Sequence, residues 1–261
     1  MIQLRYYQEE AVASVWEWFN NGGHAPLIVT PTGSGKSIIL AEIIRQAISW
    51  YPETKIAVVT HVKELVVQDF EKVRLLCPNI SAGIYSAGLN KRQIKQVTVA
   101  SIQSVYKNEH FHGYFHIIIV DEAHLIPHKS DGMYRGLLEA ASKKNEDLKL
   151  IGLTATPYRL DSGVLHKGDG ALFDGISYEA NLGRLIEEGY LCPLTSNIGD
   201  NTNLDGVKIT AGEYNLGQLS ERMSAIELVH HHAQVILERC KNRKSLLVFS
   251  VTVEHARKIT E

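Results

Sequence analysis

Short apolar runs recur along the first part of the chain, and segments with helical periodicity separate them. The runs cover residues 27–30, 56–60, 97–100, 117–120 and 150–153. They are apolar at nearly every position rather than at alternate positions, which is typical of parallel strands buried on both faces. We therefore expect an α/β fold with a parallel central sheet, in which helices connect the strands by right-handed crossovers.

The segment after the first run shows the helical pattern clearly. Within residues 37–50, Leu40, Ile43 and Ala47 recur at helical spacing, and Glu42 and Arg45 lie on the other side. A stripe of this kind indicates a helix that packs one face on the sheet.

The composition changes near residue 195, where Asn, Asp, Gly and Thr become frequent and periodicity is lost. Such a segment is typical of a connection between domains. Beyond it, helical patterns over 226–240 and 253–259 flank a strand-like run at 245–250, which resembles the opening of a second α/β domain. We therefore predict a first lobe, a connection and the start of a second lobe that the chain leaves incomplete, at residues 1–194, 195–225 and 226–261.

Composition and charge exclude several classes of protein. The chain has 261 residues, 44% hydrophobic and 21% charged, which is ordinary for a packed globular protein. Its formal net charge of −2 supplies no bulk basic field for nucleic acid. No apolar stretch approaches the roughly 20 residues that cross a bilayer, and the first residues do not resemble a leader peptide. We therefore expect a cytoplasmic protein without a membrane partner.

A glycine-containing turn follows the first apolar run and leads directly into the helix at 37–50. A strand, a Gly-rich turn ending in Lys-Ser or Lys-Thr, and a helix form the context of a P-loop, which binds nucleotide phosphates. Thr30 stands where the general pattern has its first glycine, and a turn that only joins strand to helix is the structural alternative. The turn consists of Pro31, Thr32, Gly33, Ser34, Gly35, Lys36 and Ser37.

Each end of this turn has a distinct expected task. Gly33 and Gly35 allow the backbone N–H groups to face phosphate oxygens at the start of the helix. Lys36 is expected to neutralise the β- and γ-phosphates, and the Ser37 hydroxyl to bind Mg²⁺. ATP and Mg²⁺ are therefore the predicted cofactors.

Two acids follow the apolar run at 117–120, and the carboxyl ends of parallel strands are where such folds bind ligands. Asp121 is expected to hold Mg²⁺, directly or through water. Glu122 is expected to orient and deprotonate the attacking water. An Asp-Glu pair on a surface loop is the alternative for these two residues alone, but the P-loop upstream favours catalysis.

With these two segments in place, the chain resembles the superfamily 2 helicases of the DEAD/DEAH-box type. The resemblance implies a RecA-like P-loop NTPase lobe followed by the beginning of a second one. Residues 4–8 are similar to the Q motif, and this implies that Arg5 and Gln8 contact the nucleotide, with the Gln8 amide reading adenine. Residues 246–256 are similar to motif IV of the second lobe.

Further similar segments imply residues that bind nucleic acid or couple the sites. The segments at 60–68 and 99–104 resemble those that contact the sugar-phosphate backbone of the bound strand. The histidine of the acidic segment and the threonines of 153–159 resemble coupling residues. The expected nucleic-acid contacts are Thr60, His61, Lys63, Ser101 and Gln103, and the expected coupling residues are His124, Thr154 and Thr156.

For His124, a metal ligand and a solvated histidine remain alternatives to the coupling role. The amino-acid residues within the motifs are most similar to those of bacterial and phage RadD-like DNA-repair ATPases. This likeness implies DNA rather than RNA as the bound nucleic acid, with single-stranded-DNA-binding or repair proteins as partners.

One family feature has no counterpart in the sequence. Superfamily 2 helicases carry a later segment whose arginines stabilise the transition state, and the nearest string here is residues 181–184, with Glu187 in place of the second arginine. Two hypotheses follow: an ATP-dependent DNA motor, and an ATP-switched DNA-binding module with little turnover. A GTPase is disfavoured because Gln93 stands where a guanine-binding Asp belongs in the Asn-Lys-x-Asp pattern.

Overall fold

The computed structural model describes residues 3–126, 132–159, 163–168, 171–193, 204–210 and 213–260. The chain divides into two compact units, Met1–Leu194 and Thr195–Glu261. Each unit is described by itself below.

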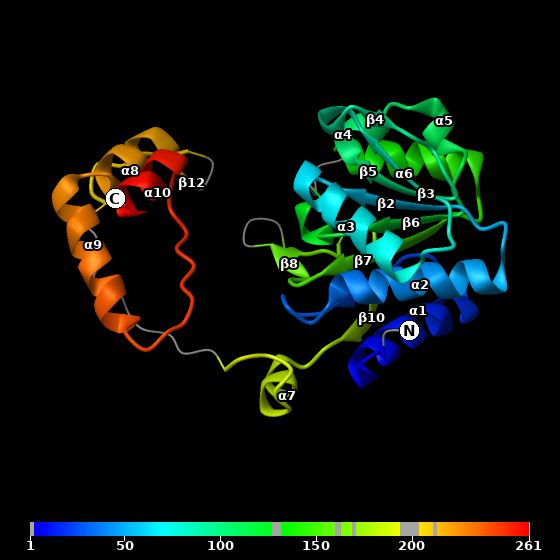
Figure 1. Cartoon of the computed structure of the whole chain (residues 1–261). Helices are drawn as coiled ribbons and strands as arrows, with labels where there is room; N and C mark the ends of the chain where they lie inside the picture. Colours follow the sequence, from blue (N-terminus) through cyan, green and yellow to red (C-terminus); the bar gives the residue numbers. More distant parts are fainter. Residues whose placement is uncertain are drawn as a thin grey trace. The chain divides into compact units, whose positions relative to one another are not determined.

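The first unit is built on one large sheet (Figure 1). Its strand order, among the described residues, is β10-β1-β7-β6-β2-β5-β3-β4, and every neighbouring pair is parallel except β3 with β4. The α/β fold with a mainly parallel sheet is therefore confirmed. The strands are β1 Pro26–Val29, β2 Ile56–Thr60, β3 Ala82–Ser86, β4 Lys91–Arg92, β5 Val97–Ser101, β6 Ile117–Val120, β7 Lys149–Thr154 and β10 Gly175–Glu179.

Helices cover both faces of this sheet and explain the unbroken apolar runs. The helices are α1 Tyr6–Asn20, α2 Lys36–Trp50 and α3 Lys63–Leu76 on one face, and α4 Ile102–Val105, α5 Glu109–His112 and α6 Met133–Lys144 on the other. Alternate residues of β6 join opposite cores: Ile117 and Ile119 pack with α1 to α3, whereas Ile118 and Val120 pack with α4 to α6. Because both faces are buried, each strand position favours an apolar side chain.

Three strands of this sheet were not predicted, β3, β4 and β10. The β4 strand is only two exposed residues long. The β3 and β10 strands are only partly buried, and both contain small and polar residues that break the apolar signal. Gly175 in β10 leaves room for the ring of Trp18, because an added Cβ would lie 2.8 Å from it. A strand whose packing depends on a glycine carries little hydrophobic signal in the sequence.

The second unit holds a short hairpin and three helices among its described residues. These elements are β11 Ile209–Thr210, β12 Glu213–Tyr214, α8 Leu216–Met223, α9 Ile226–Arg239 and α10 Val253–Thr260. The predicted helices near 226–240 and 253–259 are formed. Part of the predicted connection carries the hairpin and α8, whose N-cap is the side chain of Asn215. Residues 195–203 and 211–212 of the predicted connection lie outside the described residues.

The predicted strand at 245–250 is wrong. These residues have no strand partner in the described part of the chain, and the Leu247 and Phe249 side chains are 77% and 90% exposed. An isolated strand has no neighbour for its backbone N–H and C=O groups, so an apolar run alone does not form one. The assignment of 226–261 to a second RecA-like lobe stays a prediction.

No helix among the described residues is long and apolar enough to span a bilayer.

Two glycines allow a stability test of the packing. A Cβ at Gly152 of β7 would lie 2.5 Å from Phe173 and 2.7 Å from Leu27, whereas one at Gly136 of α6 meets nothing within 4 Å. We expect Gly152→Val to lower the free energy of unfolding by about 2 kcal/mol or more. Gly136→Ala should raise it by about 0.5–1 kcal/mol, because alanine favours a helix. Urea unfolding of both variants measures these free energies. An unfolding free energy of Gly152→Val equal to that of the unmodified chain would contradict the packing described.

Candidate functional site at the carboxyl edge of the sheet

Polar residues collect where the central parallel strands end. In spatial order the residues at the ends of β1, β7, β6, β2 and β5 are Thr30, Thr154, Asp121, Thr60 and Ser101. All five are at least nine-tenths buried, and Asp121, at 9% exposure, is the most exposed of them. The neighbouring strand positions are apolar, so this edge is the place where the sheet can present polar chemistry.

The turn over residues 31–37 has the conformation of a phosphate cradle. Gly33 and Gly35 have φ values of 84° and 89°, a region that favours glycine. Within the described part of the chain, the backbone N–H groups of Gly33, Gly35, Lys36 and Ser37 donate to no protein acceptor. Free N–H groups at the start of a helix bind anions, and the residues present therefore fit a nucleotide phosphate.

The Lys36 ammonium lies between the turn and the acidic pair. Its Nζ is 3.5 Å from the carbonyl oxygen of Thr30 and 4.0 Å from Oε1 of Glu122. The Lys36 side chain is only 12% exposed, so its charge is poorly screened by water. The predicted phosphate lysine and the predicted catalytic base are thus brought together across the sheet edge.

The acidic pair occupies two different environments. Burial, with the nearby Glu122 carboxylate, raises the pKa of Asp121 to about 6, while Lys36 opposes the shift. Glu122 has φ 52° and ψ 52°, the left-handed region that non-glycine residues rarely adopt. Such strain clusters at functional sites because surrounding contacts must hold it. The strained backbone turns the Glu122 carboxylate toward Lys36 and His124.

Three predicted coupling residues lie in one hydrogen-bonded chain. Nδ1 of His124 is 3.2 Å from Oε2 of Glu122 and 3.1 Å from Oγ1 of Thr154. The Thr154 hydroxyl donates to the carbonyl of Thr156 and accepts from its N–H. A change at the Glu122 carboxylate can therefore reach the backbone after β7 through direct contacts.

The side-chain amide of Gln8, the predicted adenine reader, forms hydrogen bonds with protein atoms. The Gln8 amide donates to the carbonyl of Ser34 at 2.9 Å, and its oxygen accepts from the N–H of Arg5 at 3.0 Å. Tyr7 donates to the same Ser34 carbonyl at 2.8 Å. Gln8 therefore holds the phosphate turn against the N-terminal segment, and its contact with adenine stays a prediction.

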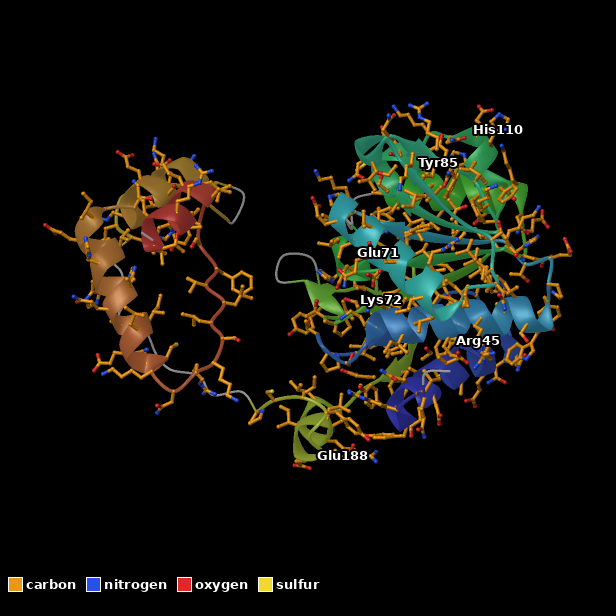
Figure 2. The ribbon with its side chains drawn as sticks, viewed as in Figure 1. Arg45, Glu71, Lys72, Tyr85, His110 and Glu188 are labelled. Carbon is orange, nitrogen blue, oxygen red and sulfur yellow. The ribbon has the colours of Figure 1, made fainter. Side chains whose placement is uncertain are left out.

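A tyrosine that sequence reasoning missed lies beside this segment. Helix α7, Leu182–Glu187, is followed by Tyr190, whose ring lies 4.9 Å from the Arg5 guanidinium and 5.5 Å from the Tyr7 ring. Figure 2 shows Glu188 at the end of α7, and its Oε2 accepts a 2.6 Å hydrogen bond from Tyr6. No local pattern marks Tyr190, because it meets the N-terminal helix only through the fold.

The predicted nucleic-acid residues separate into exposed and buried ones. His61, Lys63 and Gln103 are exposed, and the Gln103 amide donates to the carbonyl of His61 at 2.9 Å. Thr60 and Ser101 are 0% and 5% exposed. The two segments meet at one surface, and its accessible groups are the first three.

A second residue missed by the sequence analysis is a buried acid on α3. Asp69 is 2% exposed, and its Oδ2 has no partner in the described structure. Burial, with the Asp121 and Glu122 carboxylates, raises the pKa of Asp69 to about 8. The signal in the sequence is an acid within an otherwise apolar helical stripe.

The donor set also fits Mg²⁺ held mainly by phosphate and water. Among the described residues, no group of three or more His, Cys, Asp or Glu side chains is arranged to hold a metal ion. Magnesium in nucleotide sites commonly uses one or two protein ligands, and Ser37 with Asp121 can supply these.

Comparison with known proteins identifies the family. Residues 1–159 match the family ResIII, described as "Type III restriction enzyme, res subunit". The chain belongs to this family. The match covers the glycine turn, the acidic pair and the threonines of the coupling chain, so the fold and the family agree on a superfamily 2 helicase motor domain.

Individual relatives extend the similarity over nearly the whole chain. The protein irc3 of Schizosaccharomyces pombe, named as a mitochondrial ATP-dependent helicase, is 30% identical over 99% of this chain and 42% of its own length. IRC3 of Saccharomyces cerevisiae is 26% identical over 98% of this chain and 38% of its own length. This chain thus spans about two fifths of the length of these relatives.

A solved structure supports the same fold. UvsW of phage T4 aligns over 99% of this chain and 49% of its own length, with a TM-score of 0.53 and 18% identity. The RecA-like architecture of the predicted lobe is confirmed.

The buried acid on α3 predicts how stability changes with pH. An acid whose folded pKa lies above its unfolded value binds more protons in the native state, so stability falls as pH rises between the two values. For Asp69 this window runs from an ordinary value of 3.8 to about 8. Relative to the unmodified chain, Asp69→Asn should gain up to about 1.4 kcal/mol per pH unit between pH 4 and 8. Urea unfolding across this range tests it; parallel pH profiles would contradict the burial of an acid.

Proposed function

We propose that this chain is the ATP-binding lobe of a DNA motor, which binds Mg²⁺–ATP at the carboxyl edge of its sheet and hydrolyses it. The observation that carries the proposal is the position of Lys36, within 4.0 Å of Glu122 and beside the free N–H groups of the turn. This arrangement leaves an anion-binding cradle next to the Glu122 carboxylate, whose backbone is strained. Phosphoryl transfer to water requires an anion-binding site and a group that orients the water, and the two features can supply them.

The proposed roles divide among four parts of the site. The N–H groups from Gly33 to Ser37 and the Lys36 ammonium hold the phosphates. Asp121 and the Ser37 hydroxyl hold Mg²⁺, which would neutralise charge on the phosphate oxygens when bound. The Glu122 carboxylate orients the attacking water and accepts its proton. The Arg5 guanidinium and the Tyr190 ring provide a surface for the base, with Gln8 bracing the turn.

DNA is proposed as the bound nucleic acid from the names of the relatives and the surface near His61. Three further relatives, each aligned over 51–60% of this chain, are named ATP-dependent DNA helicases. The LlaGI restriction enzyme, with a TM-score of 0.53, was solved with a DNA substrate mimic. The exposed Lys63 and Gln103 can donate to backbone phosphates. The same proposal includes the likeness to RadD-like ATPases, repair or single-stranded-DNA-binding proteins as partners, and a cytoplasmic location. It also includes the domain layout, with a connection at 195–225 and a second lobe that begins at 226.

A second candidate is an ATP-switched DNA-binding module with little turnover. Arg184 lies in residues 181–184, the string most similar to the arginine segment of the family. Its Nε donates a 2.7 Å hydrogen bond to Oε1 of Glu188, and its guanidinium lies 4.5 Å from the Tyr6 ring centroid. A guanidinium held in this way is not presented to the phosphates of the turn. Lys36, whose Nζ is 4.0 Å from Oε1 of Glu122, then supplies positive charge at the acidic pair.

Two substitutions test the proposed site. Lys36→Ala should weaken binding of Mg²⁺–ATP by about tenfold or more, because the charge-assisted contact to phosphate is lost. Glu122→Gln should keep binding and lower hydrolysis by about 10²-fold or more, because the base is lost. Fluorescent-nucleotide titration and steady-state ATPase assays, with and without single-stranded DNA, measure both. Lys63→Ala is the control, expected to weaken only DNA binding.

The outcomes separate the two candidates. Turnover that single-stranded DNA stimulates excludes the binding-only module. Nucleotide binding without turnover favours it. Normal binding by Lys36→Ala would contradict the phosphate site itself.

The hydrogen-bonded chain from Glu122 gives a separate prediction. Thr154→Val keeps the shape of the side chain and removes the hydroxyl that joins His124 to Thr156. We expect ATP affinity within about twofold of the parent and a loss of most DNA stimulation of turnover. If the variant is stimulated by DNA as strongly as the parent, this chain of contacts does not couple the two sites.

A further inference from the structure

Helix α3 buries an acid on its sheet-facing side. Val66, Asp69 and Val73 form the buried stripe of the helix, whereas Glu71 and Lys72 are exposed on α3, where Figure 2 labels them. Asp69 Oδ2 has no hydrogen-bond partner in the described structure. Burying a polar group without a partner costs folding free energy, and a helix stripe otherwise made of valine has no structural need for it.

The unpartnered carboxyl faces the same side of the sheet as the end of two central strands. Val58 and Ile119 pack in the same core as Val66 and Val73. Because side chains alternate along a strand, Thr60 and Asp121, each two residues further on, are directed toward the same face. The N–H of Asp121 donates to the carbonyl of Val59, which places Thr60 beside it.

Other polar atoms around Asp121 also lack partners. The hydroxyls of Thr60 and Tyr134 are buried without a hydrogen-bond partner in the described structure. The Asp121 carboxylate raises the pKa of Tyr134 and of Asp69, so both side chains lie within its electrostatic reach. Unsatisfied groups from β2 and α3, on one side of the sheet, and from α6, on the other side, thus lie near the carboxylate that we assign to Mg²⁺.

We propose that Asp69 is a positioning residue for Asp121, which aligns that carboxylate for Mg²⁺–ATP and links it to the exposed start of α3. This inference rests on the proposed function. The unsatisfied atoms are those expected of a set that becomes fully bonded only when the ligand fixes the orientation of the Asp121 carboxylate. Asp69 does not contact the reacting atoms; it acts through Asp121.

The same helix connects this carboxyl to the nucleic-acid surface. Helix α3 begins at Lys63, next to the exposed His61. Six residues of helix span about 9 Å, so a displacement of Lys63 by a bound strand moves Asp69 as part of the same rigid element. The route is distinct from the hydrogen-bonded chain through His124 and Thr154.

Replacing Asp69 by an apolar residue should preserve or raise the stability of the fold and weaken Mg²⁺-dependent nucleotide binding. Replacing a buried, unpartnered carboxyl by an apolar side chain of similar size is often neutral or stabilising. A purely structural acid would instead lower the melting temperature when removed. We therefore expect Asp69→Leu to melt at or above the temperature of the unmodified chain.

The test measures the Mg²⁺ concentration that half-saturates binding of a fluorescent ATP analogue to the full chain. Asp69→Leu should raise this concentration about tenfold, the typical effect of losing an outer-shell partner, while affinity for the analogue in EDTA stays unchanged. Asp69→Asn retains hydrogen-bonding capacity and should stay within about threefold of the unmodified chain. Glu71→Leu, which removes an exposed acid from the same helix, is the control and should not shift the curve.

An unaltered Mg²⁺ curve for Asp69→Leu overturns this inference alone. Equal shifts in Asp69→Asn and Asp69→Leu also overturn it, because charge rather than positioning would then act. If the unmodified chain binds no Mg²⁺–ATP, the proposed function fails first and this inference falls with it.

Discussion

Burial of a parallel sheet on both faces is the constraint from which the rest of this lobe follows. Helices above and below leave strands such as β6 no water-facing side, so their interiors must be apolar. Charged side chains contributed by the strands can then lie only where the strands end and the backbone turns. In this chain the ends of β1, β7, β6 and β2 adjoin one another. The turn at 31–37 follows β1 and the acidic pair follows β6, so the strand order alone brings them to the same edge.

The electrostatics of that edge are unbalanced in the protein alone. Asp69 and Asp121 are buried acids with raised pKa values, and the ammonium of Lys36 is the nearby cation seen in the described residues. Bringing buried carboxylates together is costly unless a cation offsets their charge. A divalent ion with a triphosphate beside free N–H groups satisfies both sets of groups. The same imbalance that lowers stability therefore favours ligand binding, as is common at functional sites.

Sequence reasoning succeeded where one local pattern carries the information. The central strands, the glycine turn and the acidic pair each occupy a short contiguous segment, so periodicity and spacing could predict the fold and bring these residues to one edge. It failed where a residue acts through tertiary contacts. Tyr190 reaches Arg5 only after the chain returns along β10, and Asp69 is recognisable as unusual only when its unpartnered oxygen is seen. The strand predicted at 245–250 failed because a strand requires a partner, which no single segment specifies.

Two physical links leave the acidic pair in different directions, and they transmit different signals. The contacts from Glu122 through His124 to Thr154 are direct polar contacts of 3.2 Å and 3.1 Å, so the proposed link from the catalytic carboxylate to the backbone after β7 runs through them. The proposed link through Asp69 is a packed helix with a buried carboxyl group, so it would respond to displacement of α3. A nucleic-acid strand bound near His61 would displace the helix, whereas a change at the nucleotide would alter the contacts of Glu122. Either link alone would make the coupling reciprocal, because each ligand then changes the affinity for the other by the same factor. Two links through different contacts allow substitutions in one to be tested while the other is left intact.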